Sequence, residues 1–133
     1  MKLVKGILIT FVVTGFLSAL GVNAQSIGYA DIKIPALNGI YDGGQANKTA
    51  GGSHSLYTVD ARDSWNYNDT RRVEARTRTM FGTTIYSPWT EVKIKGTIYM
   101  SDGYNDIGAY KLQLRAIKTT ASSTRYWGNW STQ

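Results

Sequence analysis

Three stretches of the chain alternate between small or apolar residues and polar residues with a period of two. They are residues 72–80 (RVEARTRTM), 91–100 (EVKIKGTIYM) and 110–118 (YKLQLRAIK). Such alternation over eight or more residues is typical of β-strands that turn one face to a core and the other to water. Shorter patterns at residues 29–34 and 55–61 predict two further strands.

The segments between these strands are rich in turn-forming residues. Residues 38–52 (NGIYDGGQANKTAGG) predict a Gly-rich loop, and residues 62–70 and 101–108 predict polar turns. Short strands separated by such turns favour an all-β fold. We therefore predict a single antiparallel β-sandwich of about six to eight short strands. Residues 25–52 would supply an N-terminal strand and the Gly-rich loop, and residues 53–133 the remainder of the same domain.

The first 24 residues predict an N-terminal signal peptide helix. Lys2 and Lys5 precede a largely apolar run over residues 6–22, and Ala24 ends the small-residue pattern after which cleavage is expected. The run is short for a membrane span, and no later stretch is apolar enough for one. We expect a secreted mature chain without a membrane span. Its net charge falls from +6 to +4, because two basic residues and no acidic residue leave with the signal peptide.

The composition excludes several kinds of site. Cysteine is absent and His54 is the single histidine, so the chain can form neither a disulfide nor a metal centre built on His and Cys. No cofactor is predicted. A charge of +4 favours contact with anionic envelope polymers but is no sign of nucleic-acid binding, which an exported protein would rarely encounter. The sequence does not indicate an oligomeric state.

Two segments of the chain resemble each other. Residues 74–91 (EARTRTMFGTTIYSPWTE) and 114–133 (LRAIKTTASSTRYWGNWSTQ) both run from an Arg-bearing strand through a polar turn to an aromatic-x-x-Trp ending. This predicts two equivalent β-hairpins that locally resemble the last hairpin of fibronectin type III domains. We expect Arg76 to stack on Trp89, and Arg115 on Trp130, within their own hairpins.

The candidate catalytic and metal-binding groups are few. His54 lies between two serines, but nothing in the sequence positions a nucleophile and an acid around it, as a hydrolytic triad requires. Most carboxylates lie in turns, where Asp commonly caps its own backbone. The clusters at 63–69 and 102–106 could bind calcium, although neither has EF-hand spacing and plain turns are favoured. We therefore predict no catalytic residue and no metal site.

Aromatic and basic residues are the best candidates for ligand binding. All nine tyrosines and all four tryptophans follow residue 24. Exposed flat rings can stack on sugars, although several of the tryptophans could equally form the core. Trp65 is the strongest candidate because its polar turn offers no core to fill. The predicted ligand-binding residues are Trp65, Tyr67, Tyr104, Trp127, Arg76 and Arg78.

The chain is similar to two groups of proteins. Its signal peptide, its Thr/Ser-rich strands and its closing segment at 110–130 (YKLQLRAIKTTASSTRYWGNW) resemble a family of small exported proteins of Bacillus-type bacteria, described only as a domain of unknown function. The acidic tail of that family is absent here. Residues 53–60 (SHSLYTVD) and 70–79 (TRRVEARTRT) resemble the lactococcin-type sandwich bacteriocins. This resemblance implies action on cell-wall precursors of Gram-positive bacteria.

Three functions are consistent with these features. The leading hypothesis is a secreted, non-enzymatic β-sandwich that binds an extracellular or cell-envelope partner such as a cell-wall polymer. The alternative is a bacteriocin-like antibacterial protein that acts on the Gram-positive envelope. A glycan hydrolase is a more distant alternative, because such enzymes need a positioned pair of carboxylates.

Overall fold

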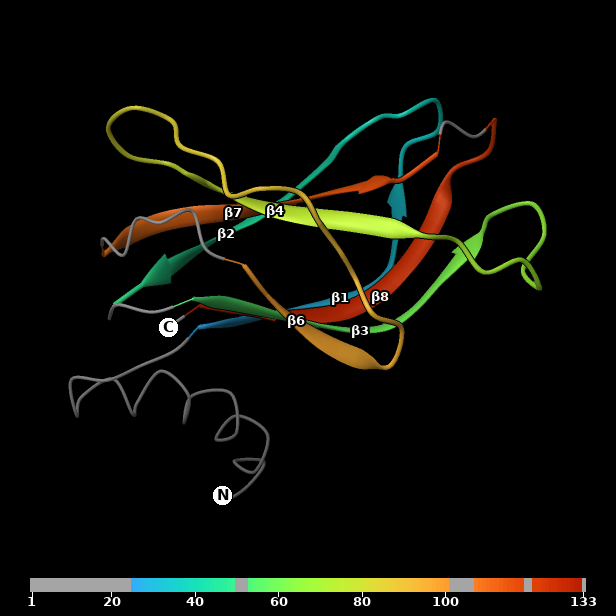
Figure 1. Ribbon diagram of the computed structural model, residues 1–133, viewed down its shortest axis with the longest axis horizontal. Helices are drawn as coiled ribbons and strands as arrows, with labels where there is room; N and C mark the ends of the chain where they lie inside the picture. Colours follow the sequence, from blue (N-terminus) through green and yellow to red (C-terminus); the bar gives the residue numbers. More distant parts are fainter. Residues whose placement is uncertain (1–24, 50–52, 101–106, 119–120, 133) are drawn as a thin grey trace, which may run out of the picture.

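The computed structural model describes residues 25–49, 53–100, 107–118 and 121–132. In these residues the chain forms eight strands and no helix. Two four-stranded antiparallel sheets face each other, sheet 1 with the order β1-β8-β3-β6 and sheet 2 with the order β2-β7-β4-β5 (Figure 1). The strands are β1 (Ser26–Ile34), β2 (Tyr41–Lys48), β3 (His54–Asp63), β4 (Val73–Thr79), β5 (Thr90–Glu91), β6 (Gly96–Met100), β7 (Gly108–Ala116) and β8 (Thr124–Ser131).

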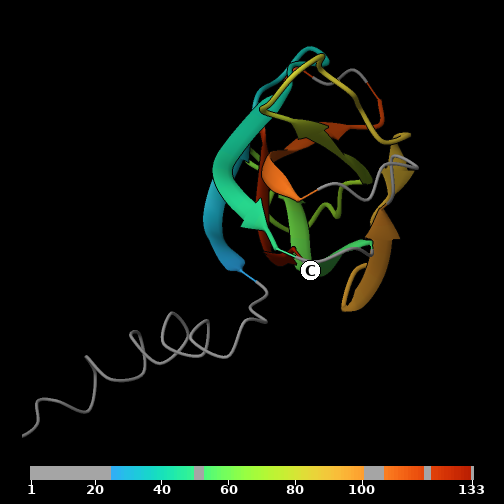
Figure 2. The same cartoon turned by 90° about the vertical axis from the view of Figure 1, so that its left-hand side faces the viewer.

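This architecture confirms the prediction of an all-β sandwich of six to eight strands. The predicted signal peptide helix lies outside the described residues. No helix long and apolar enough to cross a membrane occurs in the described part of the chain. Figure 2 shows β1 and β2 along one side of the sandwich and β6 along the opposite side.

The core lies between the two sheets and is formed by the inward side of each alternating strand. The period-two pattern predicted the buried faces of β4 and β7 correctly, because Val73, Ala75, Leu112 and Leu114 are all fully buried. Burial of each large apolar side chain contributes roughly 1.5–3 kcal/mol. The largest buried apolar side chains are Trp130, Tyr110, Tyr126, Ile34, Leu56, Met100, Leu112 and Leu114.

Two β-bulges flank the central strand β8 at the same level. The register of β8 shifts by one residue against β3 between Tyr57 and Asp60, and against β1 between Tyr29 and Ile32. In β3 Thr58 continues the inward alternation of Leu56 and bonds to the Tyr126 hydroxyl at 2.7 Å, and beyond the extra residue the inward positions begin at Ala61. A bulge absorbs one residue without reversing the inward face of the strand beyond it. The apolar alternation therefore continues into the core on both sides of each bulge.

The Gly-rich segment 38–52 differs from the prediction. Its residues 41–48 form strand β2, which pairs with β7 and bulges between Asp42 and Gln45. A Cβ atom at Gly43 would lie 2.6 Å from the Tyr29 hydroxyl, so a larger residue would displace the Tyr29 side chain of β1. Strand β2 is held by backbone pairing with β7. Because two of its residues are glycines, its sequence lacks the alternation of side chains that would have predicted a strand.

The predicted strand at 91–100 is interrupted. The chain leaves sheet 2 after β5 and enters sheet 1 at β6, crossing the edge of the sandwich (Figure 1). Lys95 adopts a left-handed φ of 59°, and the Gly96 amide donates to the Lys93 carbonyl at 3.0 Å. This tight turn breaks the strand although the apolar alternation continues through it.

The two similar segments do not form equivalent hairpins, so that prediction is wrong. The first segment folds back on β4, through a bridge between Arg78 and Tyr86 and through β5. The second segment divides between the sheets, with β7 in sheet 2 and β8 in sheet 1. Its two halves face each other across the core instead of sharing an edge. The Arg-bearing strands of both segments, β4 and β7, are antiparallel neighbours in sheet 2.

Candidate functional site

The outer face of sheet 2 carries two of the predicted ligand-binding residues, Arg76 and Arg78. Arg78 pairs with Asp42 through an Nη2–Oδ2 distance of 2.9 Å, and this hydrogen bond is the main reason why the pKa of Asp42 is lowered. On the same face Arg115 pairs with Glu74 at 3.0 Å. These guanidinium groups already have carboxylate partners within the chain.

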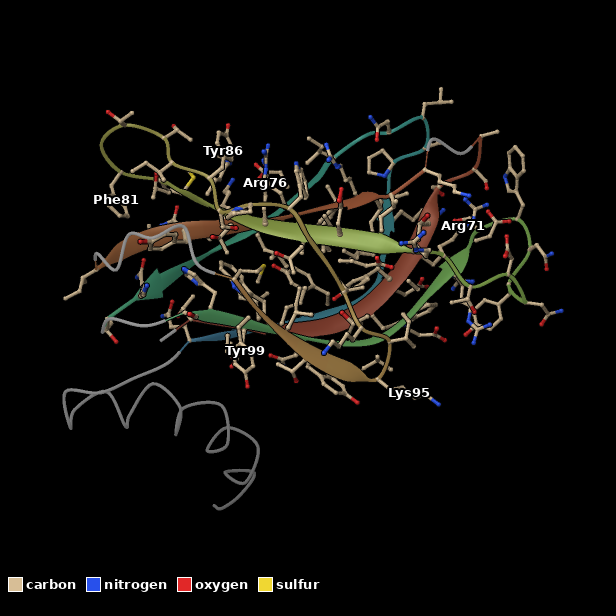
Figure 3. All side chains as sticks on the ribbon, in the orientation of Figure 1. Arg71, Arg76, Phe81, Tyr86, Lys95 and Tyr99 are labelled. Atoms are coloured by element: carbon tan, nitrogen blue, oxygen red, sulfur yellow. The ribbon has the colours of Figure 1, made fainter. Side chains whose placement is uncertain are left out.

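Arg76 is held by rings instead of by a carboxylate. Its guanidinium carbon lies 3.9 Å from the centre of the Tyr86 ring and 4.4 Å from that of Trp89. Its Nε donates to the Gln113 side chain at 2.8 Å, and partial burial lowers the pKa of Arg76. Figure 3 shows Arg76 and Tyr86 together on the sheet 2 side of the molecule. The stack of Arg76 on Trp89 confirms the sequence-based prediction.

The predicted stack of Arg115 on Trp130 is wrong. Trp130 is fully buried in the core, whereas Arg115 lies over Trp89, 4.0 Å from the centre of the ring. The two arginines thus cover one tryptophan from neighbouring strands. The outer face of sheet 2 is a network of internal ion pairs and ring contacts.

The outer face of sheet 1 brings together two other predicted residues, Tyr67 and Trp127. Their ring centres lie 6.1 Å apart with an edge-to-face angle of 88°. Arg125 approaches both rings, at 5.5 Å from Tyr67 and 5.4 Å from Trp127, and pairs with Asp31 at 2.6 Å. Trp65, in the same loop as Tyr67, is 78% exposed, as its polar turn predicted. Tyr104 lies outside the described residues.

Strand pairing adds two exposed tyrosines to the same face. Tyr57 on β3 is 42% exposed and Tyr99 on β6 is 69% exposed. Neither tyrosine is among the ligand-binding residues predicted from the sequence. The signal was present, because each is an aromatic residue at a position where alternation expects a polar one, beside the buried Leu56 and Ile98. Figure 3 shows Tyr99 on the side of the sandwich opposite Tyr86.

The register arranges these rings along a diagonal of sheet 1. Tyr57 pairs with Thr97 on one side and with Asn129 on the other. Tyr99 follows Thr97 by two positions and Trp127 precedes Asn129 by two, so the rings step across neighbouring strands in one direction. Diagonal neighbours on one face of a sheet lie about 7–8 Å apart. We call the residues Tyr99, Tyr57, Trp127 and Tyr67 the aromatic line.

Two cross-strand rows, which share Tyr57 and Tyr99 with the aromatic line, form a surface that we call the uncharged platform. The rows extend over all four strands of sheet 1, and none of their side chains is ionised at neutral pH. Apart from Tyr57 and Tyr99, the side chains are small or of moderate size. The first row is Ser26, Ser131, Ser55 and Tyr99, and the second is Gly28, Asn129, Tyr57 and Thr97.

The single histidine belongs to the core. The His54 ring lies 4.6 Å from the ring of Tyr110 and 5.7 Å from that of Trp130, measured between centres. Burial is the main cause that lowers its pKa to about 4, and the charge of Lys48 adds to it. Among the described residues neither ring nitrogen has a hydrogen-bond partner. A neutral imidazole enclosed in this way contributes packing.

Asp63 acts as a turn cap, as predicted. Its carboxylate accepts hydrogen bonds from the Asn66 amide at 2.7 Å, from Arg71 at 2.6 Å and from Ser122. The Ser122 bond is the main cause of the lowered pKa of Asp63. Within the described ranges no three His, Cys, Asp or Glu side chains lie close enough to hold a metal ion. The second cluster, at 102–106, lies outside them.

A cavity of about 330 Å³ lies beside this turn and is bordered by Arg71, Arg72 and Lys118. Arg71 is committed to Asp63, and Arg72 to Glu91 at 2.7 Å. The cavity lacks the exposed rings of sheet 1, and most of its positive charge is already neutralised.

Comparisons of the chain with protein-family models, with curated proteins and with solved structures give no match. The outer face of sheet 1 is the candidate functional site.

Proposed function

We propose that the mature chain is a secreted, non-enzymatic protein that binds a cell-envelope polymer through the outer face of sheet 1. The observation that carries this proposal is the aromatic line, in which exposed rings from two strands reach a Tyr–Trp pair held by Arg125. Large aromatic side chains exposed together on one surface are a common feature of binding sites. A flat ring presents an apolar face to the C–H groups of a sugar.

The contrast with sheet 2 supports this choice of face. On sheet 2 the indole of Trp89 lies beneath two guanidinium groups, and Tyr86 is in contact with Arg76. On sheet 1 Tyr57 and Tyr99 remain accessible to water in the free protein. A ligand that covers them would gain apolar contact without displacing an internal ion pair.

The test is a pull-down of the purified mature chain with isolated Gram-positive cell walls. We expect Tyr57→Ala combined with Tyr99→Ala, and Trp127→Ala separately, to weaken binding at least about tenfold, which corresponds to about 1.4 kcal/mol. Tyr86→Ala is the matched control, because Tyr86 is 47% exposed but lies on sheet 2. Equal binding by all four proteins would refute the proposed face.

The bacteriocin-like alternative uses the same fold and can be separated by a second assay. Growth inhibition of Gram-positive indicator strains by low concentrations of the purified chain would favour it. Inactivity together with wall binding supports a binding protein that does not kill the cell.

A further inference from the structure

We infer that the ligand of sheet 1 is an uncharged glycan strand that lies over the uncharged platform and crosses the β-strands. This inference rests on the proposed function and specifies its ligand class. It distinguishes neutral polysaccharides from the phosphate-bearing polymers that a basic protein would suggest.

The distribution of charge over the molecule is the first argument. The platform extends over four strands without an ionised side chain, although 18% of the chain is charged. The opposite outer face, on sheet 2, presents charges on β2, β4 and β7, namely Asp42, Glu74, Arg76, Arg78, Lys111 and Arg115. An anionic polymer obtains much of its affinity from accessible cations, and none of the eight side chains of the platform is a cation.

The cations on the strands of sheet 1 lie at the other end of its face and are largely paired with carboxylates, whereas the exposed Lys95 lies in the turn before β6, at the edge of this face. Lys33, Arg125 and Arg62 form one cross-strand row there. Arg125 pairs with Asp31 at 2.6 Å, and Arg62 pairs with Asp60 at 2.9 Å. Beside the aromatic line, the guanidinium groups of Arg125 and Arg62 are therefore in contact with rings and paired with carboxylates of the same chain. They attract an anionic ligand only weakly.

The hydrogen-bonding chemistry of the platform is the second argument. Hydroxyl and amide side chains both donate and accept, which matches the hydroxyl groups of a sugar. Ser26 and Ser131 already bond to each other, with 2.8 Å between their Oγ atoms, and each hydroxyl keeps capacity for another partner. Tyr57 and Tyr99 border these groups with flat apolar faces. A few polar groups beside aromatic surface are the usual composition of a site for a neutral ligand.

Gly28 provides the third argument and a selective test. A Cβ atom built at this position meets nothing within 4 Å, so neither packing nor φ requires glycine here. Gly28 lies opposite Asn129 in the second row. Because Gly28 has no side chain, nothing projects from β1 at this point of the second row. A polymer can therefore lie across the strands there. A larger residue at position 28 would obstruct the ligand without disturbing the core.

The deciding experiment compares Gly28→Gln and Gly28→Arg in binding to intact cell walls and to walls stripped of anionic polymers. For a neutral glycan, stripped walls bind as well as intact walls, and raising salt from about 50 to about 200 mM changes the affinity less than twofold, unlike a site that depends on many ion pairs. Both variants should then lose at least about tenfold in affinity, because both obstruct the platform. Gly44→Gln is the control, since Gly44 is exposed on sheet 2 and a Cβ there meets nothing closer than 3.8 Å.

The outcomes separate this inference from the proposed function. Loss of binding on stripped walls, strong weakening by salt, or tighter binding by Gly28→Arg would show an anionic ligand and overturn the inference, while envelope binding would stand. Unchanged binding by both Gly28 variants would also overturn it, because the polymer would then avoid the platform. Absence of binding to any wall preparation would refute the proposed function itself. Thermal melts of each variant confirm that the fold is retained.

Discussion

The guanidinium of Arg115 lies 4.0 Å from the centre of the Trp89 ring and reaches it over strand β4. Arg115 belongs to β7, and Trp89 immediately precedes β5, on the other side of β4. With Arg76 on the same indole, the contact joins three neighbouring segments of sheet 2. Trp89 is therefore part of the framework of this sheet although it lies outside the core.

The position of Trp89 predicts a moderate loss of stability on substitution. Trp89→Ala should lower the free energy of unfolding by about 1–2 kcal/mol, because two cation–π contacts of roughly 0.5–1 kcal/mol each are lost. Binding to cell walls should remain. Urea unfolding and the wall pull-down measure the two effects. Trp130→Ala is the reference for a buried ring and should cost about 3–5 kcal/mol. A Trp89→Ala protein that unfolds like wild type but no longer binds would place the binding site on sheet 2.

The buried His54 should make the folded protein less stable in mild acid. Its pKa is lowered from 6.5 to about 4 in the folded protein, so the unfolded chain binds the proton more readily. The stabilisation is complete above about pH 6.5 and is lost as the pH falls toward 4. Between about pH 7 and pH 5 the free energy of unfolding should fall by about 2 kcal/mol. The nearby positive charge of Lys48 acts in the same direction.

The control for this titration is His54→Phe, which keeps a flat ring and removes the titrating group. Its free energy of unfolding should change little over the same range, whatever its absolute stability. The lowered pKa values of Asp31, Asp42, Asp63 and Glu91 affect stability at lower pH, where these carboxylates take up protons. Parallel pH profiles for the wild type and His54→Phe would contradict the assignment.

Substitution of Gly128 is expected to affect both the stability of the fold and binding by the outer face of sheet 1. A Cβ at this position would lie 2.4 Å from the Tyr126 hydroxyl and 2.7 Å from the backbone oxygen of Tyr57. Gly128→Ala should therefore destabilise the protein by about 1–3 kcal/mol, as overpacking usually does. It should also weaken wall binding, because the displaced backbone carries Tyr57. Urea unfolding and pull-down test both effects, and an unchanged protein would contradict the tight contact.

Loss of the buried hydroxyl pair between Tyr126 and Thr58 should also destabilise the fold. Tyr126→Phe removes the 2.7 Å bond to Thr58 and leaves the Thr58 hydroxyl without this partner in the core. We expect a loss of about 1–3 kcal/mol in the free energy of unfolding. The variant Tyr126→Phe with Thr58→Val removes both groups and should recover much of that loss. A double variant no more stable than the single one would show that the pair is not coupled.

The proposed signal peptide predicts a defined N-terminus for the secreted chain. Mass spectrometry of protein recovered from the medium should show a chain that begins at Gln25, whose backbone nitrogen donates to the Thr132 hydroxyl at 3.2 Å. Substitution of Ala24 by Lys should disturb processing, because signal peptidase requires a small residue before the cleavage point. Recovery of a secreted form that retains Met1 would contradict the proposed signal peptide.

The alternation of apolar and polar residues was sufficient to predict the fold class and most of the strands. β4 and β7 bury the faces that their sequences predicted, because a period of two is a local property of an extended backbone. The same pattern could have identified Tyr57 and Tyr99 as outward-facing aromatic residues. The exposure of Trp65 and the capping by Asp63 also followed from local turn chemistry.

Tertiary structure decided which of these residues meet. Alternation assigns a side chain to one side of its strand, but strand order, sheet membership and bulges depend on pairing between distant segments. The register of β3, β6 and β8 brought Tyr57, Tyr99 and Trp127 to one face. The division of β7 and β8 between the sheets buried Trp130 and directed Arg115 to Trp89. The backbone pairing of β2 likewise ordered a glycine-rich segment whose side chains carry almost no pattern, since hydrogen bonds between main chains do not require one.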